Sequence, residues 1–129
     1  MTLKKYPKAP VVFALGVNGN GNPAKNVKRT SYYKYYMKHY PSHDYYISTV
    51  GGTGISAIGS YKNSKVRSFN RRLKKKYKNN KKVCVYDCYQ FLVESKLLNP
   101  GKSNKGTRDG LHYENRVYAK ILKDCRKFI

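Results

Sequence analysis

The chain has 129 residues, which is enough for one hydrophobic core and not for two. Its 28 Lys and Arg against six Asp and Glu give a net charge of +22, which attracts phosphate polymers, anionic glycans or acidic membranes from a distance. No apolar run is long enough to cross a bilayer and residues 1–10 lack a signal-peptide pattern, so we expect a soluble protein whose compartment the sequence leaves open.

The first half of the chain alternates between strand and helix patterns. Residues 9–16, APVVFALG, are a near-continuous apolar run that ends in glycine, and they predict a strand centred on Val11 to Leu15 and buried on both faces of a parallel sheet. A helix is predicted over 24–40, where Pro41 ends it. A second strand is predicted over 45–50, again closed by glycine.

The second half continues the alternation. Apolar residues recur at spacings of three and four between Val66 and Tyr77, which predicts a basic amphipathic helix with a narrow apolar stripe. A third buried strand is predicted over 82–87, a short helix over 88–98 and a closing helix over 117–128. This alternation predicts a single α/β domain over residues 1–129, with right-handed crossovers and helices on both faces of a parallel sheet.

Residues that can carry chemistry collect where the predicted strands end. The segment 16–19, GVNG, follows the first strand, and 51–54, GGTG, follows the second, although GGTG lacks the Lys-Ser/Thr ending of a phosphate-binding loop. Asp109 and His112 stand in the loop before the last helix. An aspartate that orients an imidazole, which in turn deprotonates a hydroxyl, makes up two thirds of a hydrolytic triad.

At these positions the sequence resembles the SGNH or GDSL family of serine esterases and acyl hydrolases. The family's Gly-x-Asn-Asp block is matched by residues 16–18, with Gly19 in place of the aspartate. Its Asp-x-x-His block is matched by Asp109 and His112, and the match continues in order from Val11 to the C-terminus. The resemblance implies a three-layer, flavodoxin-like α/β/α fold and hydrolysis of esters or acyl groups.

The resemblance also implies a role for each matched residue. His112 would act as general base and then as general acid, because its reference pKa of about 6.5 suits both proton transfers. Asp109 would accept a hydrogen bond from the other ring nitrogen and fix the tautomer. Asn18 would donate its side-chain N–H to the developing oxyanion. No cofactor is expected.

The family's nucleophile is absent from the residues that match. The serine stands in a Gly-Asp-Ser block at the end of the family's first strand, ahead of the strand that corresponds to Val11 to Leu15. About the first third of the family's domain is therefore expected to be missing, and the chain alone is expected to lack hydrolase activity. Ser48 and Ser56 are poor substitutes, since neither stands in a nucleophile elbow.

The missing strands would leave one edge of Val11 to Leu15 unpaired. Such an edge is a template for another chain, so we expect self-association, or pairing with an N-terminal fragment. An alternative to the hydrolase is a non-catalytic basic module that binds an anionic polymer such as a nucleic acid or a glycan. The densest basic run, residues 70–82, is most simply a solvated helix face.

A metal site and a disulfide framework are both disfavoured. His39 and His43 are four residues apart, as are Cys84 and Cys88, but Pro41 interrupts the helix that would align the two histidines. With Cys125 the cysteines are odd in number, and small core hydrophobes are the simplest role for them.

Overall fold

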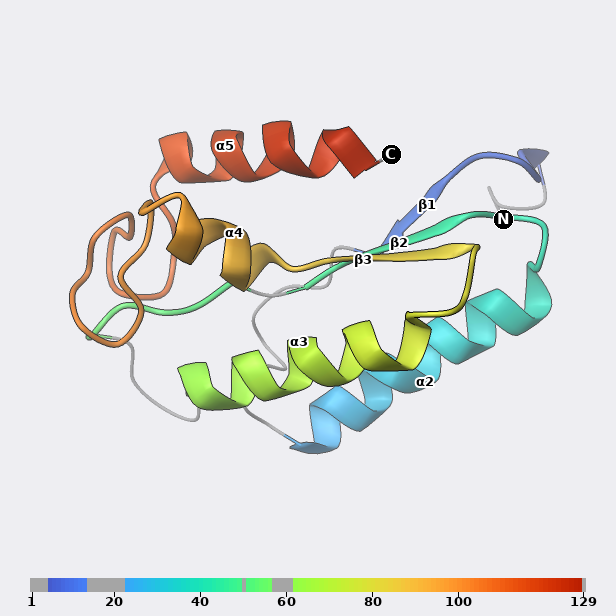
Figure 1. The fold of residues 1–129 in the computed structure, drawn as a ribbon, viewed down its shortest axis with the longest axis horizontal. Helices are drawn as coiled ribbons and strands as arrows, with labels where there is room; N and C mark the ends of the chain where they lie inside the picture. The colour runs from blue at the N-terminus through green and yellow to red at the C-terminus, as the bar shows by residue number, and fades with distance from the viewer. Residues whose placement is uncertain (1–4, 14–22, 50, 57–61, 129) are drawn as a thin grey trace.

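The computed structural model of the protein describes residues 5–13, 23–49, 51–56 and 62–128. Strands and helices alternate among these residues as predicted. The elements are β1 (Val11–Phe13), α2 (Pro23–His39), β2 (Tyr45–Ser48), α3 (Asn63–Tyr77), β3 (Val83–Tyr86), α4 (Cys88–Glu94), α5 (Asn115–Cys125) and the 3-10 helix η2 (Arg126–Phe128) (Figure 1). None of the described helices is both long and apolar enough to cross a membrane.

The three strands form one parallel sheet in the order β1-β2-β3. Phe13 pairs with Ile47, and Ile47 pairs with Val85, so these side chains share one face of the sheet. The predicted α/β class and parallel pairing are confirmed. Each parallel neighbour needs a crossover connection, and α2 and α3 supply the two crossovers.

Helices α2 and α3 cover one face of the sheet (Figure 1). Tyr33 of α2 and Ile47 of β2 are fully buried, and the apolar stripe of α3 packs against them through Phe69 and Leu73. The Phe13 ring lies 5.0 Å from that of Tyr33. Burial of each such side chain stabilises the fold by roughly 1.5–3 kcal/mol, so tyrosine rings do supply the apolar area that aliphatic residues do not.

Helices α4 and α5 pack on the other face, over β3. Tyr86, Leu92 and Val117 are buried together there, and the Tyr86 hydroxyl donates to Asp124 at 2.9 Å. These two helices do not extend over β1. Val12, which points to the same face as Tyr46 and Cys84, is 42% exposed. The prediction of a strand buried on both faces is therefore wrong at Val12.

Helix α4 ends at Glu94, four residues before the predicted end. The backbone turns through Lys96, whose φ of 59° lies in the left-handed region, and the amides of Leu97 and Leu98 both donate to the carbonyl of Leu92. Leu98 lies beyond the end of α4 but is still buried in the core that α4 and α5 share. Its apolar side chain is therefore explained by this packing and does not indicate that the helix continues.

The basic helix α3 is solvated along most of its exposed side, but Lys74 and Arg67 make specific contacts with α4 and the residue before it. Lys74 Nζ lies 2.9 Å from the carboxylate of Asp87, which is the N-cap of α4. Arg67 donates to the Tyr89 hydroxyl at 2.9 Å. The prediction of a solvated face over residues 70–82 therefore needs correction at Lys74, whereas Arg67 precedes that run.

Two glycines of the loop between α4 and α5 provide a matched test of how closely this loop packs against the end of α4. Gly101 and Gly106 have φ values of 71° and 78°, so alanine is strained at both, by about 1–2 kcal/mol. A Cβ at Gly106 would also overlap the carbonyl oxygen of Leu97, whereas the nearest atom at Gly101 is 3.4 Å away. In denaturant unfolding, Gly106→Ala should be clearly the more destabilising of the two; equal losses would contradict the packing described.

Candidate active site

The loop between α4 and α5 docks on the segment that follows β2, at the carboxyl end of the sheet (Figure 1). Backbone hydrogen bonds join the two segments along their length. They run from Gly54 N to Gly110 O (2.6 Å), from Gly101 N to Thr53 O (3.0 Å) and from Ile55 N to Ser103 O (3.2 Å). The loop is thus held by its backbone against the segment that leaves β2.

The glycines of GGTG serve this docking. A Cβ at Gly51 would overlap the Tyr113 hydroxyl, and one at Gly52 would lie 2.7 Å from the Tyr89 ring. The Tyr113 hydroxyl donates to the carbonyl of Gly52 at 2.7 Å, and burial raises the pKa of that hydroxyl, so it remains a protonated donor. The amides of Thr53 and Gly54 are already used, by Asn63 and Gly110, so this segment is not a phosphate cradle.

The docked loop carries Asp109 and His112 as a hydrogen-bonded pair. Asp109 Oδ2 lies 2.6 Å from His112 Nδ1, and Asp109 Oδ1 accepts from the amides of Leu111 (2.9 Å) and His112 (2.7 Å). The loop therefore wraps around the carboxylate before α5 begins. Since an ionised carboxylate only accepts, Nδ1 must be the donor, and a neutral His112 ring has an unprotonated Nε2.

These hydrogen bonds also set the charge of the pair. The backbone N–H of His112 is the largest cause that lowers the pKa of Asp109 well below its ordinary value, followed by the His112 ring and the Leu111 amide. Both side chains are about half exposed, at 53% for Asp109 and 55% for His112. An exposed pair adds little to global stability, so its main physical effect is to orient the ring.

Nε2 of His112 has no hydrogen-bond partner among the described residues, and no nucleophile stands beside it there. The hydroxyl of Ser56 accepts instead from Asn104 at 2.6 Å, and Ser48 ends β2 in register with Tyr86. Burial raises the pKa of all three cysteine thiols, that of Cys88 to about 12, so none is a thiolate near neutral pH.

The predicted site residues are only partly placed. Asp109 and His112 are brought together at the carboxyl end of the sheet, whereas Asn18 and the rest of 16–19 lie outside the described residues. His43 is buried and bonds to the carbonyl of Ala9, while His39 packs on the Tyr35 ring. Within the described part of the chain, no group of three or more His, Cys, Asp or Glu side chains is arranged to hold a metal.

Residues that hold the site were not identified from sequence. Tyr113 anchors the loop, and Asn63 both accepts from the Thr53 amide and donates to the Thr53 carbonyl. The aromatic residue directly after His112 was the available signal for the anchor. Comparisons with protein-family models, curated proteins and solved structures gave no match for this chain.

The pKa of Asp109 provides a test of the pair. The pKa of Asp109 is lowered in the folded protein, so the hydrogen bonds of its carboxylate stabilise the loop fully at pH values above the unfolded-state pKa of about 3.9. This stabilisation is lost as the pH falls through the lower folded-state pKa. In His112→Ala the backbone donors remain, so the Asp109 pKa should rise only part of the way. Carboxyl ¹³C shifts would measure it.

The exposed His39 supplies the matched control. His39→Ala should leave the titration of Asp109 unchanged, because this ring packs on Tyr35 and not on the loop. A wild-type Asp109 that titrates at its ordinary value would contradict the hydrogen bonding described.

Proposed function

We propose that the chain carries the acid–base part of an SGNH-type site for ester or acyl hydrolysis. His112 is the base that receives the proton of a nucleophilic hydroxyl and returns it to the leaving group, and Asp109 orients it. The observation that carries the proposal is the pairing of His112 Nδ1 with Asp109, which directs the unbonded Nε2 of a half-exposed ring away from the carboxylate.

The sheet supports the same proposal. In an open parallel α/β sheet, sites form outside the carboxyl ends of the strands. The Asp109–His112 loop is docked there, on the segment that leaves β2. The strand order β1-β2-β3 and the helices on both faces are compatible with the last three strands of a flavodoxin-like sheet, which is the finer fold that we propose.

A partner strand belongs to the proposal. Among the described residues β1 is paired on one side only, with β2, and Val12 is exposed. A strand that carries the family's Gly-Asp-Ser block could add at the free edge of β1, which would place its serine at the carboxyl end of the sheet. The block does not occur within the 129 residues.

The chain alone should not turn over a simple aryl ester, since a base and its orienter cannot form an acyl-enzyme without a nucleophile. Turnover that survives purification and disappears in His112→Ala would place the nucleophile in this chain and contradict that part of the proposal.

A complementation assay tests the proposal positively. A fragment of an SGNH hydrolase that carries the Gly-Asp-Ser strand would be added to the chain, and labelling of its serine by a fluorophosphonate would be followed. We expect labelling that is lost in His112→Ala and retained in His39→Ala. Labelling that His112→Ala leaves unchanged would show that His112 does not activate the serine.

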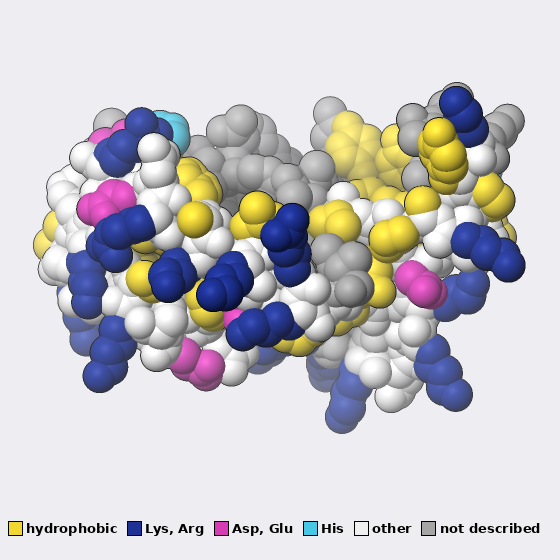
Figure 2. Space-filling view, turned by 90° about the horizontal axis from the view of Figure 1, so that it is seen from above, with side chains coloured by type: hydrophobic (Ala, Val, Ile, Leu, Met, Phe, Trp, Pro, Cys, Tyr) yellow, Lys and Arg dark blue, Asp and Glu magenta, His cyan; other side chains and the backbone are white. Residues whose placement is uncertain are grey.

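Binding of an anionic polymer is the second candidate, supported by the distribution of charge. On the face shown in Figure 2, Lys and Arg side chains are scattered over most of the described surface and outnumber the Asp and Glu side chains. The net charge of +22 favours association with phosphate or sulfate polymers regardless of sequence. Binding of duplex DNA that weakens steeply with ionic strength, without turnover in the complementation assay, would favour this candidate over the hydrolase.

A further inference from the structure

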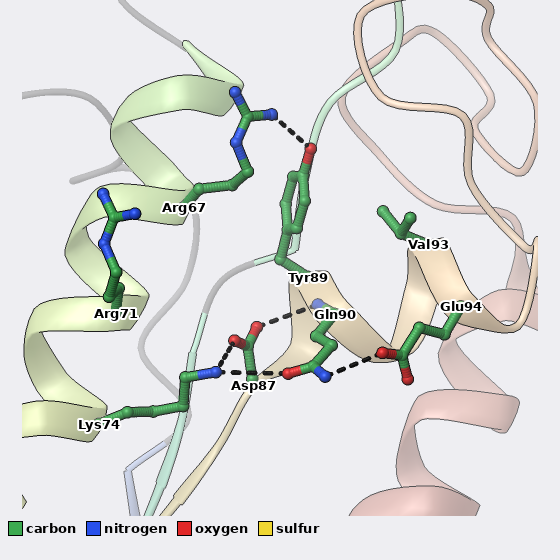
Figure 3. Close-up of a pocket in the computed structure, with 8 residues that line it drawn as sticks. All are labelled: Arg67, Arg71, Lys74, Asp87, Tyr89, Gln90, Val93 and Glu94. Carbon is green, nitrogen blue, oxygen red and sulfur yellow. Dashed lines mark hydrogen bonds and ion pairs between the residues drawn. The ribbon is translucent and has the colours of Figure 1, made fainter.

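A cavity of about 330 Å³ lies between α3 and α4. None of its lining residues takes part in the proposed hydrolase chemistry. Its wall on α3 is formed by Arg67, Arg71 and Lys74, which follow one another at a turn's spacing along one side of the helix. The other wall comes from the start of α4 and the residue before it (Figure 3). The lining residues are Arg67, Arg71, Lys74, Asp87, Tyr89, Gln90, Val93 and Glu94.

At one end of this cavity the polar side chains bond to one another, and Lys74 balances the charge of Asp87 but not that of Glu94. Lys74 pairs with Asp87 at 2.9 Å and also donates to Gln90 at 3.3 Å, and Gln90 donates to Glu94 at 2.8 Å. Asp87 additionally accepts from the Gln90 amide as the N-cap of α4. The acidic groups of the cavity are thereby engaged by its own donors (Figure 3).

The other end has unused donors. Arg67 donates to the Tyr89 hydroxyl at 2.9 Å, with its guanidinium 5.7 Å from the centre of the Tyr89 ring. That hydroxyl accepts from Arg67, so its own hydrogen is available to a further acceptor. Arg71 has no hydrogen-bond or ion-pair partner among the described residues, and Figure 3 draws none. Arg67 and Arg71 stand one turn apart on α3, about 6 Å along the helix axis at the backbone, and both line the cavity.

We propose that this end of the cavity binds a phosphate group, either as the free ion or as a phosphomonoester. Guanidinium groups bind phosphate oxygens through paired N–H donors, and a doubly charged tetrahedral anion has enough oxygens for Arg67, Arg71 and the Tyr89 hydroxyl together. Val93, 40% exposed, offers an apolar contact for the organic part of a monoester. In a chain whose basic residues are mostly lysine, two arginines line this cavity.

This site is separate from both proposed functions. It shares no residue with the Asp109–His112 loop, and it requires a fixed arrangement of donors and not merely positive charge. Diffuse attraction to the surface would depend on the number of charges and not on which arginine is removed. The neighbouring Arg72 is exposed and does not line the cavity, so it provides a control that changes the net charge by the same amount.

The experiment compares Arg71→Gln with Arg72→Gln. Inorganic phosphate and phenyl phosphate would be titrated into each ¹⁵N-labelled protein at constant ionic strength and pH, and dissociation constants taken from amide and arginine side-chain shifts. We expect Arg71→Gln to weaken binding at least fivefold and Arg72→Gln to change it by less than twofold. The shifts should concentrate at Arg67, Tyr89 and Val93.

A charge-conserving variant separates geometry from charge. Arg71→Lys should weaken phosphate binding by an intermediate factor, because it keeps the charge and loses the paired donors. Tighter binding of phenyl phosphate than of inorganic phosphate would identify a monoester as the preferred ligand, and the reverse would identify the free ion. Equal effects of Arg71→Gln and Arg72→Gln, shifts scattered over the surface, or no saturable binding would each overturn the proposal.

Discussion

The Tyr113 hydroxyl, bonded to the Gly52 carbonyl, is the contact on which the arrangement of the candidate site depends. It lies between the segment after β2 and the loop before α5, and it fits only because Gly51 has no side chain. The backbone bonds of Gly54 and Gly101 extend the same contact, so the loop has one position relative to the sheet. Because Asp109 and His112 lie in this loop, their position relative to the sheet is fixed as well. A loop as long as residues 95–114 could not otherwise hold an imidazole at a fixed place beside the strands.

A second constraint is charge. A chain with a net charge of +22 repels itself when compact, and its aliphatic content is low. Tyrosine rings meet this constraint because they bury apolar surface, and several of their hydroxyls also find acceptors: Tyr86 donates to Asp124 and Tyr45 donates to the carbonyl of Tyr40. The buried Tyr77 hydroxyl, by contrast, has no hydrogen-bond partner in the part of the chain that the structure describes. Among the few acidic residues, Asp87 makes two stabilising contacts: it caps α4 and pairs with Lys74 of α3.

The elements and their order could be predicted from sequence because each carries a local signal. Val66, Phe69, Leu73 and Tyr77 mark α3 by spacing alone, and the apolar runs mark the strands. The pairing of Asp109 with His112 was expected from their three-residue spacing taken together with the family resemblance. The docking of the loop could not be predicted, since it joins residues such as Gly52 and Tyr113 that are 61 positions apart. GGTG is equally suited to a phosphate cradle or to close packing, and only the tertiary contacts decide between them. The exposure of Val12 likewise depends on which helices reach β1.

The most direct test of the central claim, that the docked loop presents His112 as an oriented base, is the tautomer of its ring. When the ring is neutral, its ¹⁵N shifts should show a proton on Nδ1 and none on Nε2, because the Asp109 carboxylate accepts from Nδ1. Asp109→Asn should lose this preference, while His39 keeps the same spectrum in both proteins. A wild-type His112 protonated on Nε2, or a tautomer that Asp109→Asn leaves unchanged, would contradict the account.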